Sequence, residues 1–223
     1  MSPRKIVFLI LFALAVARLG AAASDKATLL TQHLSVIEKP DRVVIAWNGP
    51  VEAPMRDNLV AAIKDYRTDK RRLVISLNSP GGRVDHGRDV VEAIRMSANI
   101  RQIETFVGRG GVCASMCVPI YLVGSTRIAD PGARFMFHEA KVLIPALGKI
   151  SRYDESELAP VLKNLEKNAT DALYLRDLDA DRVNDNWRVE MRRKITDRDI
   201  WLTGKQLVDQ ESGVVDTLVF AAR

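Results

Sequence analysis

One serine in this chain stands in a setting that could make it a nucleophile. Ser115 follows a glycine-rich stretch, residues 108–114, and precedes an apolar run that we expect to form a buried helix. A serine hydroxyl reacts only when a base takes its proton and hydrogen-bond donors stabilise the negative oxygen that forms on the substrate. The setting favours this chemistry over the ordinary role of serine as a helix cap.

The candidate base is His138, which ends a strand-like segment 23 positions after the serine. The chain has three histidines, and His86 is the competitor because it follows a glycine turn that we expect near the same site. A purely structural histidine is the ordinary alternative. The strand-end position favours His138.

Two main-chain amides could stabilise the substrate oxyanion. Residues 80–82, Pro-Gly-Gly, lie between an expected strand and an expected helix, where free amides bind anions well. Met116 follows the serine at another expected helix start. We expect the amides of Gly82 and Met116 to converge on one oxygen.

The two cysteines of the chain, Cys113 and Cys117, bracket the serine. Four residues apart in a helical turn, their Cα atoms would lie about 6 Å apart, which is within disulfide range. An even cysteine count in an exported protein favours pairing. We therefore expect a bridge that fixes the geometry around Ser115, with two buried thiols as the alternative.

Strands and helices alternate around these residues, as hydrophobic periodicity and turn signals indicate. The expected strands are residues 42–47, 73–77, 102–107, 126–129, 134–137 and 213–219. The expected helices are residues 51–70, 89–96, 155–177 and 181–194, with one more beginning near residue 115 and a short helix or irregular lead-in over 26–39. The alternation predicts one α/β domain with a mainly parallel sheet and right-handed crossovers.

The first residues have the features of an export signal. Arg4 and Lys5 precede the apolar run 6–17, and Ala23 with Ser24 offers a small-residue cleavage site. The predicted organisation is a signal peptide, residues 1–23, and one folded domain, residues 24–223, which we expect in the periplasm or secreted. The run is shorter than the about 20 residues that span a bilayer, so we expect no integral membrane span after cleavage; a signal anchor is the alternative.

The charge composition gives no indication of a nucleic-acid partner. Lys and Arg number 33 against 28 Asp and Glu, and this small excess is spread along the chain. We find no convincing phosphate loop, dinucleotide fingerprint or metal-ligand spacing. We therefore expect neither a cofactor nor a metal.

Several segments in order along the chain resemble the proteolytic subunit of the Clp protease, within the crotonase-like superfamily. They are residues 43–63, 78–82, 113–117, 137–138 and 197–203. The resemblance implies a ClpP/crotonase-like fold, a serine peptidase acting on peptides or unfolded proteins, and a homo-oligomer. It implies a triad of Ser115, His138 and Asp199, and an oxyanion hole at Gly82 and Met116.

The chain also departs from that family. Cys117 stands where the family has glycine, residues 139–145 lack its usual continuation, and the residues before Val43 do not resemble loops that engage an unfoldase ATPase. An exported protein also has no ATP supply, so we expect a serine endopeptidase without an ATPase partner. Asp197 is the alternative to Asp199.

Three other functions stay open. A serine-lysine peptidase similar to signal-peptide peptidases would use Lys141 or Lys194 as its base. A catalytically silent or redox-gated peptide-binding protein would result if the bridge turned Ser115 away from His138. An acyl-CoA enzyme on the same fold would make little use of the serine.

Overall fold

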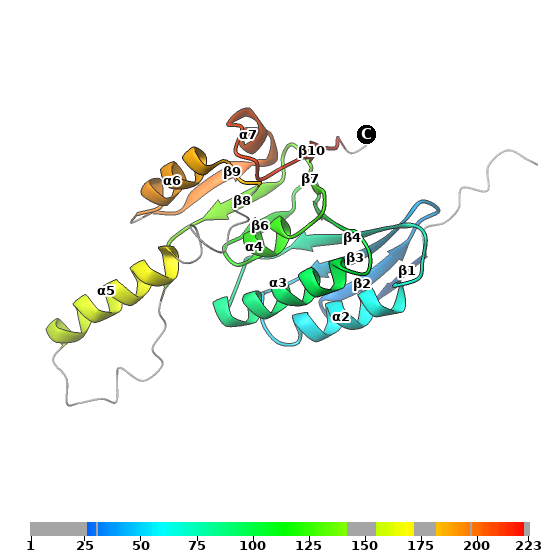
Figure 1. Ribbon diagram of the computed structural model, residues 1–223, viewed down its shortest axis with the longest axis horizontal. Helices are drawn as coiled ribbons and strands as arrows, with labels where there is room; N and C mark the ends of the chain where they lie inside the picture. Colours follow the sequence, from blue (N-terminus) through cyan, green and yellow to red (C-terminus); the bar gives the residue numbers. More distant parts are fainter. Residues whose placement is uncertain (1–25, 30, 142–154, 172–181, 197, 221–223) are drawn as a thin grey trace, which may run out of the picture.

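The computed structural model describes residues 26–29, 31–141, 155–171, 182–196 and 198–220 (Figure 1). The expected signal peptide lies outside these residues. The strands are β1 (Lys26–Leu29), β2 (Leu34–Glu38), β3 (Arg42–Asn48), β4 (Arg72–Asn78), β5 (Ile103–Val107), β6 (Val112–Ala114), β7 (Arg127–Ala129), β8 (Arg134–Phe137), β9 (Ile200–Thr203) and β10 (Thr217–Leu218). The helices are α2 (Met55–Asp65), α3 (Val84–Ala98), α4 (Cys117–Leu122), α5 (Glu155–Asp171), α6 (Asp185–Lys194) and α7 (Gly204–Asp209).

A seven-stranded sheet forms the larger half of the fold, in the order β1-β2-β3-β4-β5-β7-β10. Every pairing from β3 to β10 is parallel, and α2 and α3 lie together along one face (Figure 1). Ile45, Ile75 and Val107 are fully buried in its strands, and burial alternates along β3 and β5, as expected for strands that pack one face against a core. The predicted α/β class with a mainly parallel sheet is confirmed.

The helix or irregular lead-in predicted over residues 26–39 is wrong, because this segment forms the antiparallel strands β1 and β2. Leu34 and Val36 are buried, whereas Ser35 and Ile37 between them are partly exposed. This two-residue period is typical of a strand that covers a core on one face. The segment continues the large sheet beyond β3.

The other predicted elements keep their type but change their bounds. The helix expected from residue 51 begins at Met55, because Val51 instead pairs with Gly82. Helix α3 begins earlier than predicted, at Val84. The last predicted strand, residues 213–219, is reduced to the two residues of β10. The predicted residues 172–177 and 181 lie outside the described ranges.

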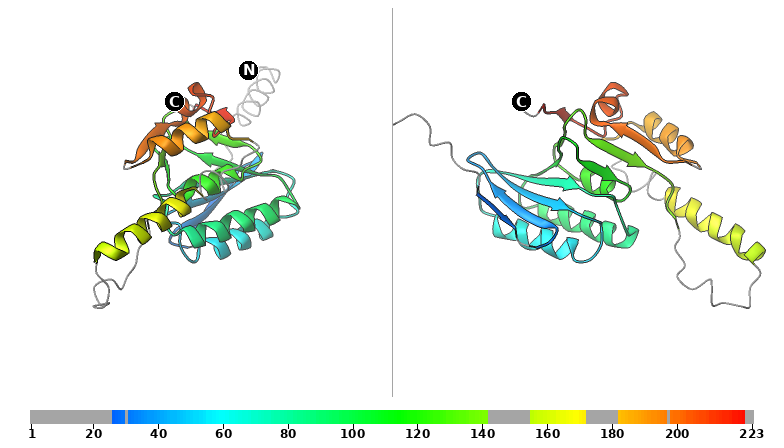
Figure 2. Two further views of the ribbon diagram at one scale, coloured as in Figure 1. Left: turned by 60° about the vertical axis from the view of Figure 1, so that its left-hand side comes forward. Right: turned by 180° about the vertical axis from the view of Figure 1, so that it is seen from behind.

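A second sheet of three strands carries the order β6-β8-β9, with β6 parallel to β8 and β9 antiparallel to it. Neither β6 nor β9 was predicted as a strand. Three residues after a glycine-rich stretch are too few to show a period, so β6 is defined by its pairing with β8 rather than by local propensity. Figures 1 and 2 show α5 projecting from the body beyond the end of β8.

Helix α4 lies in the interior and follows β6 after a two-residue turn. All six of its residues are buried, which confirms the predicted buried helix. Pro119 falls in the first turn, where an amide has no helical partner in any case. The helix thus anchors one side of the Ser115 turn in the core.

A charged pair joins β7 to the segment that precedes β10. The Arg127 side chain is 2% exposed and its guanidinium donates to both oxygens of Asp216, at 2.7 and 3.1 Å. Arg182 also bonds this carboxylate, at 2.6 Å. A buried guanidinium that loses its carboxylate partner is strongly destabilising.

We expect Asp216→Ala to lower the free energy of unfolding by about 3 kcal/mol, because Arg127 would stay buried without its counter-charge. Urea denaturation measures this loss. Asp209→Ala is the matched control: its carboxylate pairs with Lys205 on the surface of α7, and we expect a change below about 0.5 kcal/mol. Equal losses in the two variants would contradict the prediction.

Candidate functional site

Ser115 occupies a sharp turn between β6 and α4. Its φ angle is 53°, in the left-handed region that residues other than glycine rarely adopt. The Ser115 amide donates to the Met136 carbonyl of β8 at 2.9 Å, which fixes the main chain of the turn. A strained backbone held this firmly by its surroundings is typical of functional sites.

His138 comes to the same place because β6 and β8 are parallel neighbours. Ala114 pairs with Met136 in their register, so the residues that follow the two strands leave the small sheet at one edge. His138 Nε2 lies 2.6 Å from Ser115 Oγ. At this distance an imidazole can accept the hydroxyl proton directly.

The surroundings of His138 favour the neutral imidazole that a base requires. Burial lowers the pKa of His138 below that of an ordinary histidine, since the charged form loses solvation. The Asp199 carboxylate raises this pKa and the Lys141 ammonium lowers it, so both groups act on the imidazole through their charges. The net direction is downward.

Asp199 lies beside His138 through the antiparallel pairing of β8 with β9. Phe137 pairs with Ile200, so the next residue outward on each strand, His138 and Asp199, face each other across the end of the ladder. The Asp199 side chain is exposed. Asp197 lies outside the described residues, so the choice between the two aspartates stays a prediction.

The glycine turn after β4 packs directly against the serine turn. The Ser79 main-chain carbonyl accepts from the Ala114 amide at 3.0 Å, and the Ser79 amide donates to the Val112 carbonyl at 2.7 Å. These two bonds join the turn to β6. A Cβ atom on Gly81, which has a φ of 88°, would lie 2.6 Å from Ser115 Cβ. Only glycine fits here, because both the backbone angle and the contact exclude a side chain.

Gly82 and Met116, the residues predicted to form the oxyanion hole, line one cleft with Ser115, His138 and Lys141, and the volume of this cleft is about 290 Å³. Within the described part of the chain, neither the Gly82 nor the Met116 amide donates a main-chain hydrogen bond outside the regular elements. Gly82 is held between two main-chain bonds made by Val51. The arrangement leaves both N–H groups available to a substrate oxygen.

The predicted disulfide between Cys113 and Cys117 is confirmed, with a Cα–Cα distance of 5.2 Å. Both cysteines are fully buried, one in β6 and the other at the start of α4. The bridge and the Ser115–His138 contact occur together, so the bridge does not turn the serine away from the histidine.

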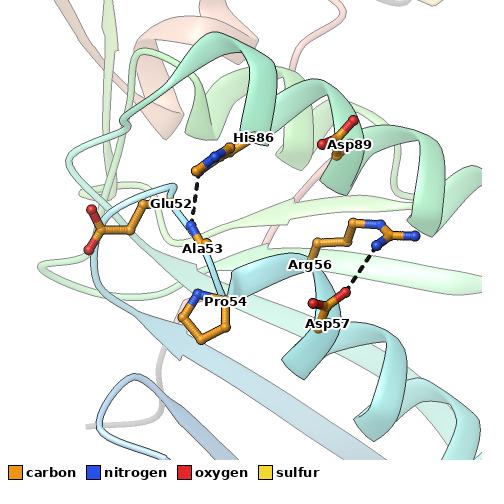
Figure 3. Close-up of a pocket in the computed structure, with 7 residues that line it drawn as sticks. All are labelled: Glu52, Ala53, Pro54, Arg56, Asp57, His86 and Asp89. Atoms are coloured by element: carbon orange, nitrogen blue, oxygen red, sulfur yellow. Dashed lines mark hydrogen bonds and ion pairs between the residues drawn. The ribbon is translucent and has the colours of Figure 1, made fainter.

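His86, the competing base, lies in a different cavity, between the start of α2 and the start of α3 (Figure 3). Its Nδ1 accepts the Ala53 amide at 2.9 Å, and the volume of that cavity is about 160 Å³. Lys194, one of the two candidate lysine bases, pairs with Glu190 at 3.3 Å on α6. Neither residue lines the cleft of Ser115.

For two residues of the site, the sequence predicted only part of the role. Gly81 was read only as part of a turn, although its contact with Ser115 shapes the site. Lys141 was considered only as a base, although it lines the cleft as a cation. A lysine shortly after the strand-end histidine was the available signal, but nothing in the sequence shows which way that segment turns.

The residues that the structure describes contain no group of three or more His, Cys, Asp or Glu side chains that could hold a metal ion. They also contain no helix with both the length and the apolar character needed to cross a lipid bilayer.

Comparisons with known proteins indicate the family of this chain. A family model described as Clp protease matches residues 34–222. The ATP-dependent Clp protease proteolytic subunit 1 of Chlamydia caviae is 30% identical over 151 residues, covering 67% of this chain and 71% of the relative. The ATP-dependent Clp protease proteolytic subunit of Streptococcus mutans is 27% identical over 186 residues, covering 80% of this chain and 85% of the relative.

A solved structure shares the fold. A ClpP1 mutant from Listeria monocytogenes superposes with a TM-score of 0.61 at 15% sequence identity, covering 80% of this chain and 91% of that one. The family is shown by the family model that matches residues 34–222 and by the 30% identity to the Chlamydia caviae subunit. The chain belongs to the Clp protease family.

Proposed function

We propose that this protein is a serine endopeptidase that hydrolyses peptide bonds with Ser115 as nucleophile and His138 as base. The observation that carries the proposal is the 2.6 Å separation between Ser115 Oγ and His138 Nε2. Membership of the Clp protease family supports it. Peptides or unfolded proteins are the substrates, and the homo-oligomer that the resemblance implies stays a prediction.

The reaction follows the serine-histidine pattern. Ser115 Oγ attacks the peptide carbonyl while His138 Nε2 takes the hydroxyl proton, and the carbonyl oxygen becomes an oxyanion that accepts from the Gly82 and Met116 amides. The imidazolium then gives its proton to the leaving amine, which departs and leaves an acyl-enzyme. Water, deprotonated by the same imidazole, releases the acid and restores the serine.

Asp199 is the third member in this proposal. Its carboxylate raises the pKa of His138 and thus stabilises the imidazolium that forms during each proton transfer. Its place opposite His138 at the end of the β8–β9 ladder supports the role. Asp197 is the alternative acid.

A serine-lysine mechanism is the second candidate, because Lys141 lines the same cleft. The histidine mechanism is preferred since the imidazole already stands within hydrogen-bond distance of the hydroxyl. The two mechanisms differ in which variant, His138→Ala or Lys141→Gln, loses all turnover.

The protein works outside the cytoplasm and without an unfoldase ATPase in this proposal. The leader of residues 1–23 and the Cys113–Cys117 bridge support export, because disulfides persist in oxidising compartments. The relatives are named ATP-dependent subunits, but no ATP is supplied outside the cytoplasm.

The nucleophile is tested with a fluorophosphonate probe and a fluorogenic peptide, using purified protein without ATP. We expect labelling and cleavage by the wild type, no labelling of Ser115→Ala, and a loss of about 10³-fold or more in kcat for His138→Ala. His86→Ala is the matched control and keeps its activity, because its ring lies in another cavity. Labelling that persists in folded Ser115→Ala would reject the mechanism.

The pH dependence follows from the lowered pKa of His138. Because the neutral imidazole is the base, kcat/KM should rise with pH through that pKa, with its midpoint below the about 6.5 of an ordinary histidine. Asp199→Asn removes a charge that raises the pKa, so the midpoint should move to lower pH. Asp209→Asn is the control that leaves it in place. A wild-type midpoint above that of an ordinary histidine would contradict the prediction.

Export is tested by expressing the full chain in a bacterium. We expect the mature protein in the periplasmic fraction to begin at Ser24, with cysteines that react with iodoacetamide only after reduction. A variant lacking residues 2–23 should stay in the cytoplasm with alkylatable cysteines. A full-length protein that remains in the cytoplasm with free thiols would refute export.

A further inference from the structure

The cleft beside Ser115 combines apolar walls with one cation. Pro80, Val84, Met116, Met136 and Ala140 form the apolar part of its lining, and Lys141 lines it as well. Among the described residues no carboxylate lines this cleft. A substrate side chain that enters it therefore meets hydrocarbon and a single positive charge.

The segment that leads to Lys141 is fixed by a contact with α5. The Ala140 amide donates to the Thr170 hydroxyl of α5 at 2.9 Å, and Thr170 is fully buried. The Thr170 hydroxyl itself donates to the Glu166 carbonyl at 2.7 Å. These contacts place the Lys141 backbone at the rim of the cleft rather than leaving it on a free loop.

The carboxylate nearest in sequence is already engaged. Glu139 pairs with Arg192 of α6 at 3.4 Å, and both side chains are largely buried. Arg192 also donates to Asp171 at 2.7 Å. No carboxylate of the described residues forms an ion pair with Lys141, whose side chain is exposed. The lysine therefore offers its charge to whatever occupies the cleft.

We infer that Lys141 is a specificity-determining residue that selects peptides with an acidic side chain at the scissile bond. The substrate carboxylate pairs with the Lys141 ammonium while the methylene groups of a glutamate lie against the apolar walls. The inference deepens the proposed peptidase function and rests on it. A charge-assisted contact at a partly exposed site corresponds to a preference of about 3- to 10-fold.

The test uses pairs of fluorogenic peptides that differ only by Glu or Gln, placed in turn on each side of the scissile bond. The wild type should give a Glu-to-Gln ratio of kcat/KM of about 3 to 10 at one of the two positions. The ratio should fall toward 1 at high salt, because ions screen exposed charges. Probe labelling of Ser115 is measured in parallel.

Four variants sharpen the test. Lys141→Gln should bring the ratio to about 1, Lys141→Glu should invert it, and Lys141→Arg should retain it, since each follows the charge at this position. Lys205→Gln is the matched control: it removes an exposed lysine that pairs with Asp209 on α7. We expect this control to keep both the ratio and the activity of the wild type.

The possible outcomes distinguish a failure of the acidic preference from a failure of the proposed peptidase function. Equal cleavage of the Glu and Gln peptides by a wild type that labels at Ser115 overturns the acidic preference and leaves the peptidase intact. Loss of all cleavage and labelling in folded Lys141→Gln makes the lysine the base and overturns both assignments. A wild type with no cleavage dependent on Ser115 rejects the peptidase proposal itself.

Discussion

The parallel pairing of β6 with β8 is the constraint on which the rest of the site depends. Because Ala114 pairs with Met136, the turn that bears Ser115 and the residue that follows β8 leave the sheet together. A slip of one residue would move every side chain of a strand to the opposite face. The antiparallel partner β9 then brings Asp199 opposite His138, so one small sheet aligns three distant segments of the chain.

Three further contacts hold the serine turn in a backbone conformation that it would not adopt alone. Gly81 lies against it from the large sheet, α4 anchors it in the core, and the bridge between Cys113 and Cys117 spans it. A left-handed residue other than glycine costs of order 1 kcal/mol or more. The surrounding fold supplies that energy, so the hydroxyl is already oriented before a substrate arrives.

Local patterns predicted what local interactions determine. The bracketing cysteines predicted the bridge, and the apolar run after Ser115 predicted a buried helix. Strands β6 and β9 were not predicted, because each is defined by its pairing with β8, which lies far away in the sequence. The strand-end position favoured His138 over His86, but only the sheet register determines which imidazole reaches the serine.

The left-handed angle at Ser115 also limits how this position can change during evolution. Threonine carries the same hydroxyl, but its branched Cβ clashes with the main chain at a positive φ. Glycine and asparagine accept the angle readily, yet neither has a hydroxyl to offer. Serine combines a hydroxyl with an unbranched Cβ, which none of these three replacements does. Each of these replacements would therefore lose either the hydroxyl or the fit to the backbone angle.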